Sequence, residues 1–299
     1  MSHWVALTAL LAAFFIGMLI APTFLRVSAR YSVSQTILSY VGQHSVKQGV
    51  PTTGGLVFIL ATIISVLIFG GYKSSMTVVI LIIFAGYGTI GFLDDLIKIR
   101  LKRNMGLRAY QKIISQVSVA ILAAIYCAKS QYIGTVIMLP ITGGGWDLGV
   151  WYIPFAAFVF LAMTNSVNLT DGLDGLAGTT NTIYFAAFSV IILFALADTV
   201  QKGDVLYQNE LQGLAVFTTS LIGALMSFLW YNSYKAKFFM GDTGSLALGG
   251  AAAAVALFVK NPLISVLIGI MFVVSSVSVI IQVVSYKTRK KRVFLMSPF

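Results

Sequence analysis

The sequence is poor in charged residues. They make up 10% of its 299 positions, whereas soluble domains carry about 25%. Apolar residues account for 58%, and the mean hydropathy is +0.92. A water-soluble globule of this size cannot hide so much apolar surface. The composition therefore excludes an ordinary soluble domain and predicts a protein whose main solvent is lipid.

Cysteine and histidine are also scarce. The single cysteine, Cys127, excludes an internal disulfide. It lies in an apolar run, so we expect a buried small side chain, and no nearby histidine could activate it as a catalytic thiol. The two histidines, His3 and His44, do not have zinc-ligand spacing. The chain has no P-loop motif, which argues against an ATP-driven pump of that type.

Long apolar runs, by contrast, fill the chain. A transmembrane helix needs about 20 apolar residues, and the first run lacks the flanks of a signal peptide, so we expect a retained helix there. We predict an all-α integral membrane protein, a polytopic helical bundle forming a single transmembrane domain over residues 1–299. Turn residues between β-prone runs predict a small external β-hairpin near 130–150. The nine predicted spans are 4–25, 54–72, 76–93, 113–128, 150–167, 179–197, 211–230, 244–259 and 262–285.

Basic residues are distributed unevenly between the loops. Sixteen of the 20 follow odd-numbered spans. The remaining four are Lys73, Lys129, Lys202 and Lys260. The positive-inside rule then places the N-terminus outside and the odd-numbered loops in the cytoplasm. The basic residues behind the net charge of +11 are therefore explained by membrane orientation and by contact with anionic lipid. We expect no nucleic-acid partner.

The same topology sorts the acidic residues. Four are predicted to lie outside: Asp147, Asp198, Asp204 and Glu210. Five, from three separate segments, are predicted to meet the cytoplasmic face: Asp94, Asp95, Asp171, Asp174 and Asp242. This convergence is the most informative feature of the sequence.

The first segment contains the adjacent acids Asp94 and Asp95. Neighbouring carboxylates at a membrane boundary repel each other and persist where they share a cation or a proton. If the helix continues, Asp94 and Lys98 share a face at i, i+4. The alternative is a solvated helix end with a local ion pair.

The second segment repeats amide and acid side chains every three residues, at Asn165, Asn168, Asp171 and Asp174. Glycines such as Gly172 let the backbone turn sharply or approach a ligand. Asn and Asp can bind a nucleobase or hold a cation through oxygen. Helix capping is the alternative, and it explains only one or two of the four residues.

The third segment, from Phe239 to Ser245, opens a helix of small residues. A helix N-terminus binds phosphate, although Asp242 could instead cap that helix. Phe239 could stack on a base or anchor the chain at the membrane interface. Lys47, Lys98 and Lys112 are candidate phosphate contacts. Together, the three segments predict a divalent cation, phosphates and a nucleotide or sugar at a membrane surface, with one substrate in water and one in lipid.

The segments resemble those of the polyprenyl-phosphate N-acetylhexosamine-1-phosphate transferases, and within them the MraY branch. The similarity covers nearly the whole chain. Its motifs are Pro51-Thr52-Thr53-Gly54-Gly55, Asp94-Asp95-Leu96-Ile97-Lys98, residues 165–178, residues 239–250 and Arg292-Val293-Phe294.

The resemblance implies a ten-helix fold with both termini outside, often a homodimer, in the bacterial inner membrane. It implies Mg²⁺-dependent transfer of phospho-MurNAc-pentapeptide from UDP-MurNAc-pentapeptide to undecaprenyl phosphate. The products would be lipid I and UMP. By motif position, Asp94, Asp95 and Asp242 match the catalytic carboxylates, and Asp242 with Asp171 matches the metal site. The substrate-binding candidates are Lys47, Lys98, Lys112, Asn165, Asn168, Asp171, Gly172, Asp174, Phe239 and Gln282.

Several alternatives remain open at this stage. One carboxylate, with Asp94 as the first candidate, could act as the base that deprotonates the lipid phosphate. The other mechanism is a phospho-enzyme intermediate formed on an aspartate. A related transferase would use UDP-GlcNAc, and a protein of another class would be a secondary transporter or flippase. The family continues past Arg292-Val293-Phe294 with a histidine-rich motif and a tenth span. Because this chain stops at Phe299, we expect it to be truncated.

Overall fold

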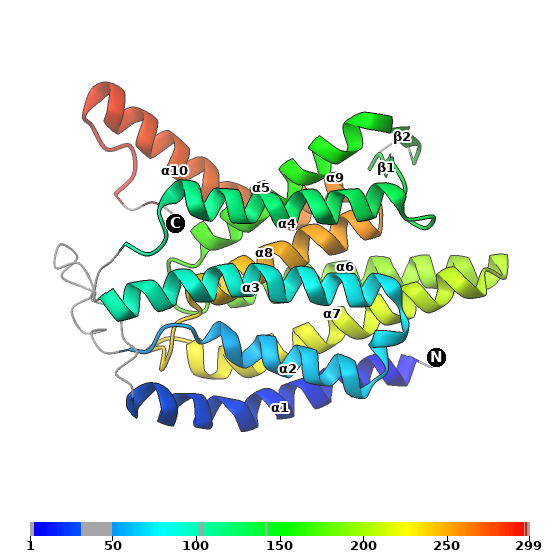
Figure 1. Cartoon of the computed structure of the whole chain (residues 1–299), viewed down its shortest axis with the longest axis horizontal. Coiled ribbons are helices and arrows are strands. Elements are labelled where there is room, and N and C mark those ends of the chain that lie inside the picture. Colours follow the sequence, from blue (N-terminus) through cyan, green and yellow to red (C-terminus); the bar gives the residue numbers. More distant parts are fainter. Residues whose placement is uncertain (1–2, 31–49, 102–104, 141–142, 296, 298–299) are drawn as a thin grey trace.

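The computed structural model describes residues 3–30, 50–101, 105–140, 143–295 and 297, and this part of the chain is helical apart from one small hairpin (Figure 1). Eight of the described helices are long and apolar enough to cross a membrane, which confirms the expected integral membrane bundle. The helices are α1 (His3–Arg30), α2 (Gly55–Ile68), α3 (Ser75–Leu101), α4 (Ala109–Lys129), α5 (Tyr152–Thr170), α6 (Leu176–Lys202), α7 (Val205–Asn232), α8 (Gly241–Phe258), α9 (Pro262–Ile268) and α10 (Ile270–Arg289).

Two predicted spans differ from the structure. The second, 54–72, is the 14-residue helix α2, about 21 Å long, followed at the left-handed Gly70 by the single turn η2 (Gly71–Lys73). The ninth, 262–285, is divided at Gly269 into α9 and α10. Hydropathy averages over such breaks, because a glycine interrupts the backbone without lowering the apolar content.

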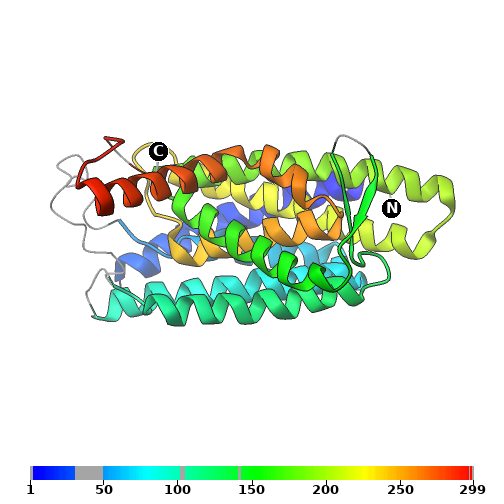
Figure 2. The same ribbon diagram turned by 90° about the horizontal axis from the view of Figure 1, so that it is seen from above.

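Helix α8 forms the centre of the bundle. Its sequence is rich in glycine and alanine, so neighbouring helices approach it closely, and 89% of the span is buried. It packs against α3 and α5 and also contacts α2 and α6 (Figures 1 and 2). In α10 only 17% of the span is buried, and this helix leans away from the bundle (Figure 1).

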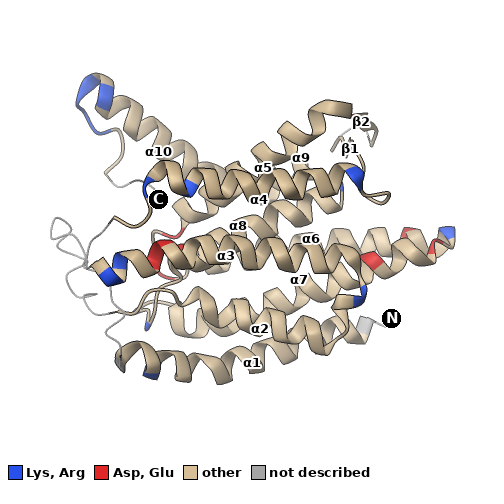
Figure 3. Ribbon diagram, in the orientation of Figure 1, with Lys and Arg blue, Asp and Glu red and all other residues tan. Residues whose placement is uncertain are grey.

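The helix ends sort into two sets. The C-terminal ends of α3, α5 and α7 lie with the N-terminal ends of α4, α6 and α8 at one end of the bundle (Figure 1). Basic residues colour this end and the nearby end of α10 (Figure 3). One red patch lies here at α3, and others lie at the opposite end of α6 and α7 (Figure 3). The antiparallel convergence of helix ends therefore brings the three acid-bearing segments together.

The predicted hairpin is also present. Strands β1 (Val136–Met138) and β2 (Gly145–Asp147) pair antiparallel, with Val136 opposite Asp147. The N–H of Met138 donates to the carbonyl of Lys260 at 2.7 Å, which ties the hairpin to the turn between α8 and α9. The hairpin thus lies at the end of the bundle opposite the start of α8 (Figure 1).

Candidate active site

Close helix contacts made by glycine bring the elements of the site together. In α3, Gly91 faces the first turn of α8, and a Cβ there would overlap the backbone carbonyl of Asp242. Gly55 of α2 and Gly244 of α8 face each other, and a Cβ on either would overlap the backbone of the other. A larger side chain at these positions would push the helices apart, so α8 can begin directly beside α2 and α3 only because glycine is there.

Asp95 holds the start of α8. The residue is fully buried, and its carboxylate accepts hydrogen bonds from the N–H of Asp242 at 3.3 Å, the N–H of Thr243 at 3.0 Å and the Thr243 hydroxyl at 2.7 Å. The first N–H groups of a helix have no partner within the helix. Asp95 supplies that partner from α3, so this carboxylate acts as a cap for another helix.

Asp242 is the centre of the site. Lys98 of α3 and Lys112 of α4 donate to its Oδ2 at 2.7 and 2.8 Å, and Asn168 of α5 donates to its Oδ1 at 2.7 Å. The N-cap position of α8 is Met240, which makes no side-chain cap. The interpretation of Asp242 as a simple helix cap is therefore wrong, because its carboxylate collects donors from three other helices.

Asp94 lies beside this group. It is 3% exposed, Lys98 pairs with its Oδ2 at 2.6 Å, and the N–H of Leu107 donates to its Oδ1 at 2.8 Å. The local ion pair expected at a solvated helix end is present, but Lys98 also bridges to Asp242. One lysine thus joins carboxylates that are 148 positions apart in the chain.

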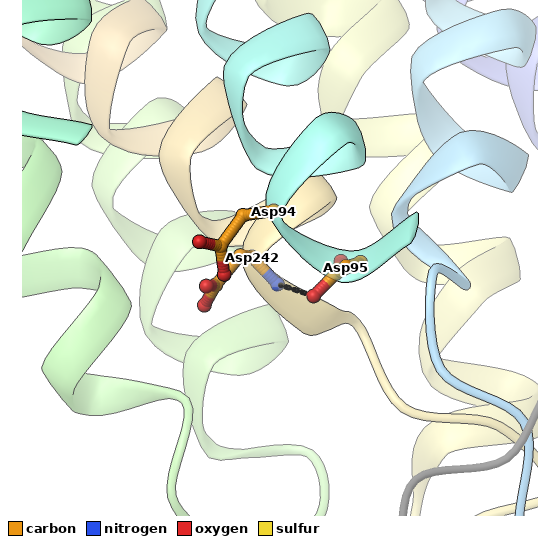
Figure 4. A group of neighbouring side chains, drawn as sticks. All are labelled: Asp94, Asp95 and Asp242. Carbon is orange, nitrogen blue, oxygen red and sulfur yellow. Dashed lines mark hydrogen bonds between the residues drawn. The ribbon is translucent and has the colours of Figure 1, made fainter. Parts of the chain in front are cut away.

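The three carboxylates form a candidate cation site. Oxygens of Asp94, Asp95 and Asp242 all lie within 4.8 Å of one another, and Figure 4 shows Asp94 and Asp242 side by side with Asp95 bonded to the α8 backbone. Carboxylate oxygens are the ligands that hard divalent cations prefer, so the donor set fits such an ion. Because Asp95 already accepts hydrogen bonds from α8, Asp94 and Asp242 are the better placed ligands.

The segment before α2 holds the loop that carries Phe239. The N–H of Phe239 donates to the carbonyl of Pro51, and the N–H of Gly54 donates to the carbonyl of Phe239, both at 2.8 Å. Between them, Thr53 has a φ of +67°, which is rare for a β-branched residue. This paired backbone fixes the partly buried Phe239 next to the start of α8.

The turn between α5 and α6 lies against the same loop. Asp171 accepts a hydrogen bond from the Gly241 N–H, while desolvation and neighbouring carboxylates raise the pKa of Asp171 well above its usual range. Asp174 accepts from the N–H of Ala236 at 3.4 Å, and Gly172 is exposed. Asp171 is not among the three described acids whose oxygens lie within 4.8 Å of one another.

Sequence reasoning missed Asn232, at the end of α7. This buried side chain accepts from the N–H of Gly175 at 3.0 Å and donates to the carbonyl of Phe238 at 2.8 Å. It therefore ties the α5–α6 turn to the loop before α8. A lone asparagine near the end of an apolar run carries no motif, and only the fold shows which two loops it joins.

Two of the predicted residues, Asn165 and Gln282, form their side-chain hydrogen bonds away from the acid cluster in the described part of the chain. Asn165 donates instead to Gln116 of α4 at 2.9 Å. Gln282 accepts from the N–H groups of residues 293–294, both at 3.0 Å, and so holds the segment after α10. Lys47 lies outside the described residues.

We expect the two adjacent acids to differ in what their loss does. In Asp95→Ala the first turn of α8 loses its buried cap, and the free energy of unfolding should fall by about 1–3 kcal/mol. In Asp94→Asn the amide oxygen can still accept from Leu107, so stability should change little. Thermal unfolding in detergent measures both, and equal melting temperatures for the two variants would contradict the assigned cap.

Comparisons with known proteins find relatives that match most of this chain. Residues 75–260 match the family described as "Glycosyl transferase family 4". A protein of Clostridium kluyveri is 44% identical over 289 residues, covering 96% of this chain and 87% of its own. One from Clostridium perfringens strain 13 is 48% identical over 255 residues, covering 85% and 75%. One from Oceanobacillus iheyensis is 41% identical over 298 residues, covering 98% and 87%. All three are named phospho-N-acetylmuramoyl-pentapeptide-transferase.

Proposed function

The chain belongs to glycosyl transferase family 4 and, within it, to the phospho-N-acetylmuramoyl-pentapeptide transferases, and on that premise we propose that it makes lipid I for peptidoglycan biosynthesis. It transfers phospho-MurNAc-pentapeptide from UDP-MurNAc-pentapeptide to undecaprenyl phosphate. The observation that carries the proposal is the convergence of Lys98, Lys112 and Asn168 on Asp242. A transporter is not favoured, because these ionisable groups gather at helix ends rather than in mid-span.

The reaction is a phosphoryl transfer. An oxygen of the lipid phosphate attacks the β-phosphorus of the donor, the bond to the UMP oxygen breaks, and UMP leaves with the electron pair. Lys98 and Lys112 supply positive charge beside this path, and each is partly shielded from water. Fixed charges in a partly dry site stabilise charge that develops on phosphoryl oxygens without reorganising.

Asp94 and Asp242 are the residues that would hold Mg²⁺. When bound, the ion neutralises negative charge on the phosphoryl oxygens. Asp95 is unsuited to act as a base or nucleophile, because its buried carboxylate accepts bonds from the α8 backbone. We propose that the Asp94 carboxylate is the base that accepts the proton of the lipid phosphate. The expected role of Asp171 as a second ligand has less support, since its carboxylate accepts from the Gly241 N–H.

Transfer of a radiolabelled donor into an organic-extractable lipid tests the function. The purified protein, with undecaprenyl phosphate and Mg²⁺, should use UDP-MurNAc-pentapeptide at least about tenfold better than UDP-GlcNAc. Chelation of the cation should stop the reaction. Preference for UDP-GlcNAc would identify the related transferase instead, and transfer from neither donor would contradict the proposal.

Phe239 is the proposed platform for the uracil ring. Its loop is fixed by backbone pairing with Pro51 and Gly54, and Phe239 lies just before the first turn of α8, which carries Asp242. Phe239→Ala should weaken binding of the UDP donor by about 1–3 kcal/mol, and Phe239→Trp should largely retain it. Isothermal titration measures both constants. An unchanged dissociation constant for Phe239→Ala would leave the ring as an interfacial anchor.

The site is proposed to face the cytoplasm of a bacterial inner membrane. Support comes from the excess of basic residues at the end of the bundle that holds the acids (Figure 3). Lys287 and Lys202 are a matched pair, since both are exposed and lie in the last turn of a helix, α10 and α6. In a Cys127→Ala background, Lys202→Cys should react with an impermeant thiol reagent outside intact cells, and Lys287→Cys should not. The reverse pattern would invert the orientation.

A homodimer is proposed from the family resemblance alone. Light scattering of the purified protein in detergent gives its mass independently of the bound micelle. A mass of one chain, about 32.3 kDa, across the working concentration range would contradict the dimer.

A further inference from the structure

All four helices that carry the acid cluster and its donors meet again about two turns further along the bundle. Tyr87 of α3 donates its hydroxyl to the backbone carbonyl of Gln116 in α4 at 3.1 Å. Its ring stacks on Phe160 of α5 with centroids 6.3 Å apart. Gly250 of α8 lies against the same ring, since a Cβ there would overlap it. This junction therefore relates α3, α4, α5 and α8 to one another below the site.

Gln116 is the buried amide of the junction. The residue is 0% exposed, and its Oε1 accepts a hydrogen bond from Nδ2 of Asn165 in α5 at 2.9 Å. The same Nδ2 donates to the carbonyl of Leu161 at 2.8 Å, which fixes the direction of the Asn165 side chain. The bond between Gln116 and Asn165 thus joins α4 to α5 through two oriented amides.

The two amides lie close, along their helices, to the residues that contact Asp242. Gln116 follows Lys112 by four residues in α4, and Asn165 precedes Asn168 by three in α5, so each amide lies about one turn from a donor to Asp242. Lys112 and Asn168 reach the two oxygens of Asp242 at 2.8 and 2.7 Å. A shift of α4 by one residue, about 1.5 Å along its axis, would break both the contact of Lys112 with Asp242 and the contact of Gln116 with Asn165.

Packing stability does not account for Gln116. Among the described residues, its Nε2 is buried without a hydrogen-bond partner. A buried donor left unpaired destabilises a fold, and an apolar side chain of similar shape avoids that cost. Methionine has a similar length and no N–H group to leave unpaired, so stability alone does not explain the amide.

We propose that Gln116 is a positioning residue: through Asn165 it sets the register of α4 against α5, so that Lys112 and Asn168 hold Asp242 in its working orientation. The inference rests on the proposed function of that site. It also gives Asn165 a role between helices rather than at the nucleotide. In this role both residues act through the groups around Asp242.

Gln116→Met separates this role from a structural one. Loss of the unpaired Nε2 should leave the melting temperature unchanged or raised, while kcat falls about tenfold and the donor KM stays within about twofold. Ser118→Ala, on the exposed face of the same helix, is the control and should change none of the three. Full kcat in Gln116→Met overturns the proposal, and so does a loss of kcat that only follows a loss of stability.

An exchange variant provides the rescue. Gln116→Asn shortens one amide so that it no longer reaches Asn165, and adding Asn165→Gln restores the combined length. The double variant should regain at least about half of the lost kcat, and a double variant no better than Gln116→Asn counts against the register argument. Rates are measured with whichever donor the unsubstituted protein turns over. A wrong assignment of the donor can then be distinguished from a failure of the proposal for Gln116.

A cycle on thermal stability with Gln116→Met, Asn165→Ala and both substitutions tests the contact without any substrate. We expect the two effects to be non-additive. Additive changes would overturn the contact itself, whatever reaction the protein catalyses.

Discussion

Asp242→Asn is expected to abolish lipid-linked transfer, with kcat/KM at least about 100-fold below the unsubstituted protein. The amide is neutral, so Lys98 and Lys112 lose the carboxylate that both contact at Oδ2. Two ammonium groups are then left close together, and the candidate cation site loses a charged ligand. The radiolabel assay over a range of donor concentrations measures the loss, and binding of UDP-donor without Mg²⁺ should survive.

The matched control for that variant is Asp198→Asn. Asp198 also pairs with a lysine, Lys202 at 2.6 Å, but both side chains are more than half exposed. Exposed ion pairs contribute about 0–1 kcal/mol, and this one lies at the far end of α6. Transfer should therefore remain near normal. Equal losses in Asp198→Asn and Asp242→Asn would mean that the acid cluster is not the site of the chemistry.

Gly91→Ala should have the second largest effect, although the residue carries no chemistry. A methyl group at Gly91 would overlap the carbonyl of Asp242, and this neighbour is backbone, which cannot rotate away. Helix α8 must then move from α3, so the cap from Asp95 and the bridge through Lys98 are stretched together. We expect a loss of about 3 kcal/mol in the free energy of unfolding and a drop of about 100-fold in turnover.

Gly86→Ala controls for the general effect of alanine in α3. The nearest atoms to a Cβ at Gly86 are the Val119 methyl groups at 3.9 Å, an ordinary contact distance. Alanine is also the better helix former by about 0.5–1 kcal/mol. Gly86→Ala should thus be neutral or slightly stabilising in thermal unfolding. A Gly91→Ala protein that melts and turns over like Gly86→Ala would show that the close approach of α3 and α8 is dispensable.

The sequence predicted the elements of this site better than their contacts. Hydropathy located every long helix, and the charge pattern grouped the acids at one end, because both signals are local and repeat along the chain. The shared face of Asp94 and Lys98 followed from helical spacing alone. Local patterns cannot show which helices are neighbours, so the bridge from Lys98 to Asp242 was beyond their reach.

The missed roles have the same physical cause. Asp94 and Asp95 are identical in type and adjacent in sequence, yet one faces the site and the other caps α8. The rotation of α3 against its neighbours decides which of the two carboxylates faces the site and which one caps α8. Similarly, Gln116 is an unremarked polar residue in an apolar run, and its importance depends on Asn165, a residue of another helix.

The long-range cap from Asp95 has a consequence for biosynthesis. Its partner Thr243 follows 148 residues later, and a ribosome adding about 5–20 residues per second needs about 7 to 30 seconds to reach it. Throughout that interval the Asp95 carboxylate of the nascent α3 lacks its hydrogen-bond partners in α8. Lys98, at i+4 from Asp94 and i+3 from Asp95, travels in the same helix, and its positive charge offsets one of the two negative charges while the chain leaves the translocon. We therefore expect the lysine proposed to serve the reaction to lower, as a counter-ion, the free-energy cost of moving its own helix into the bilayer.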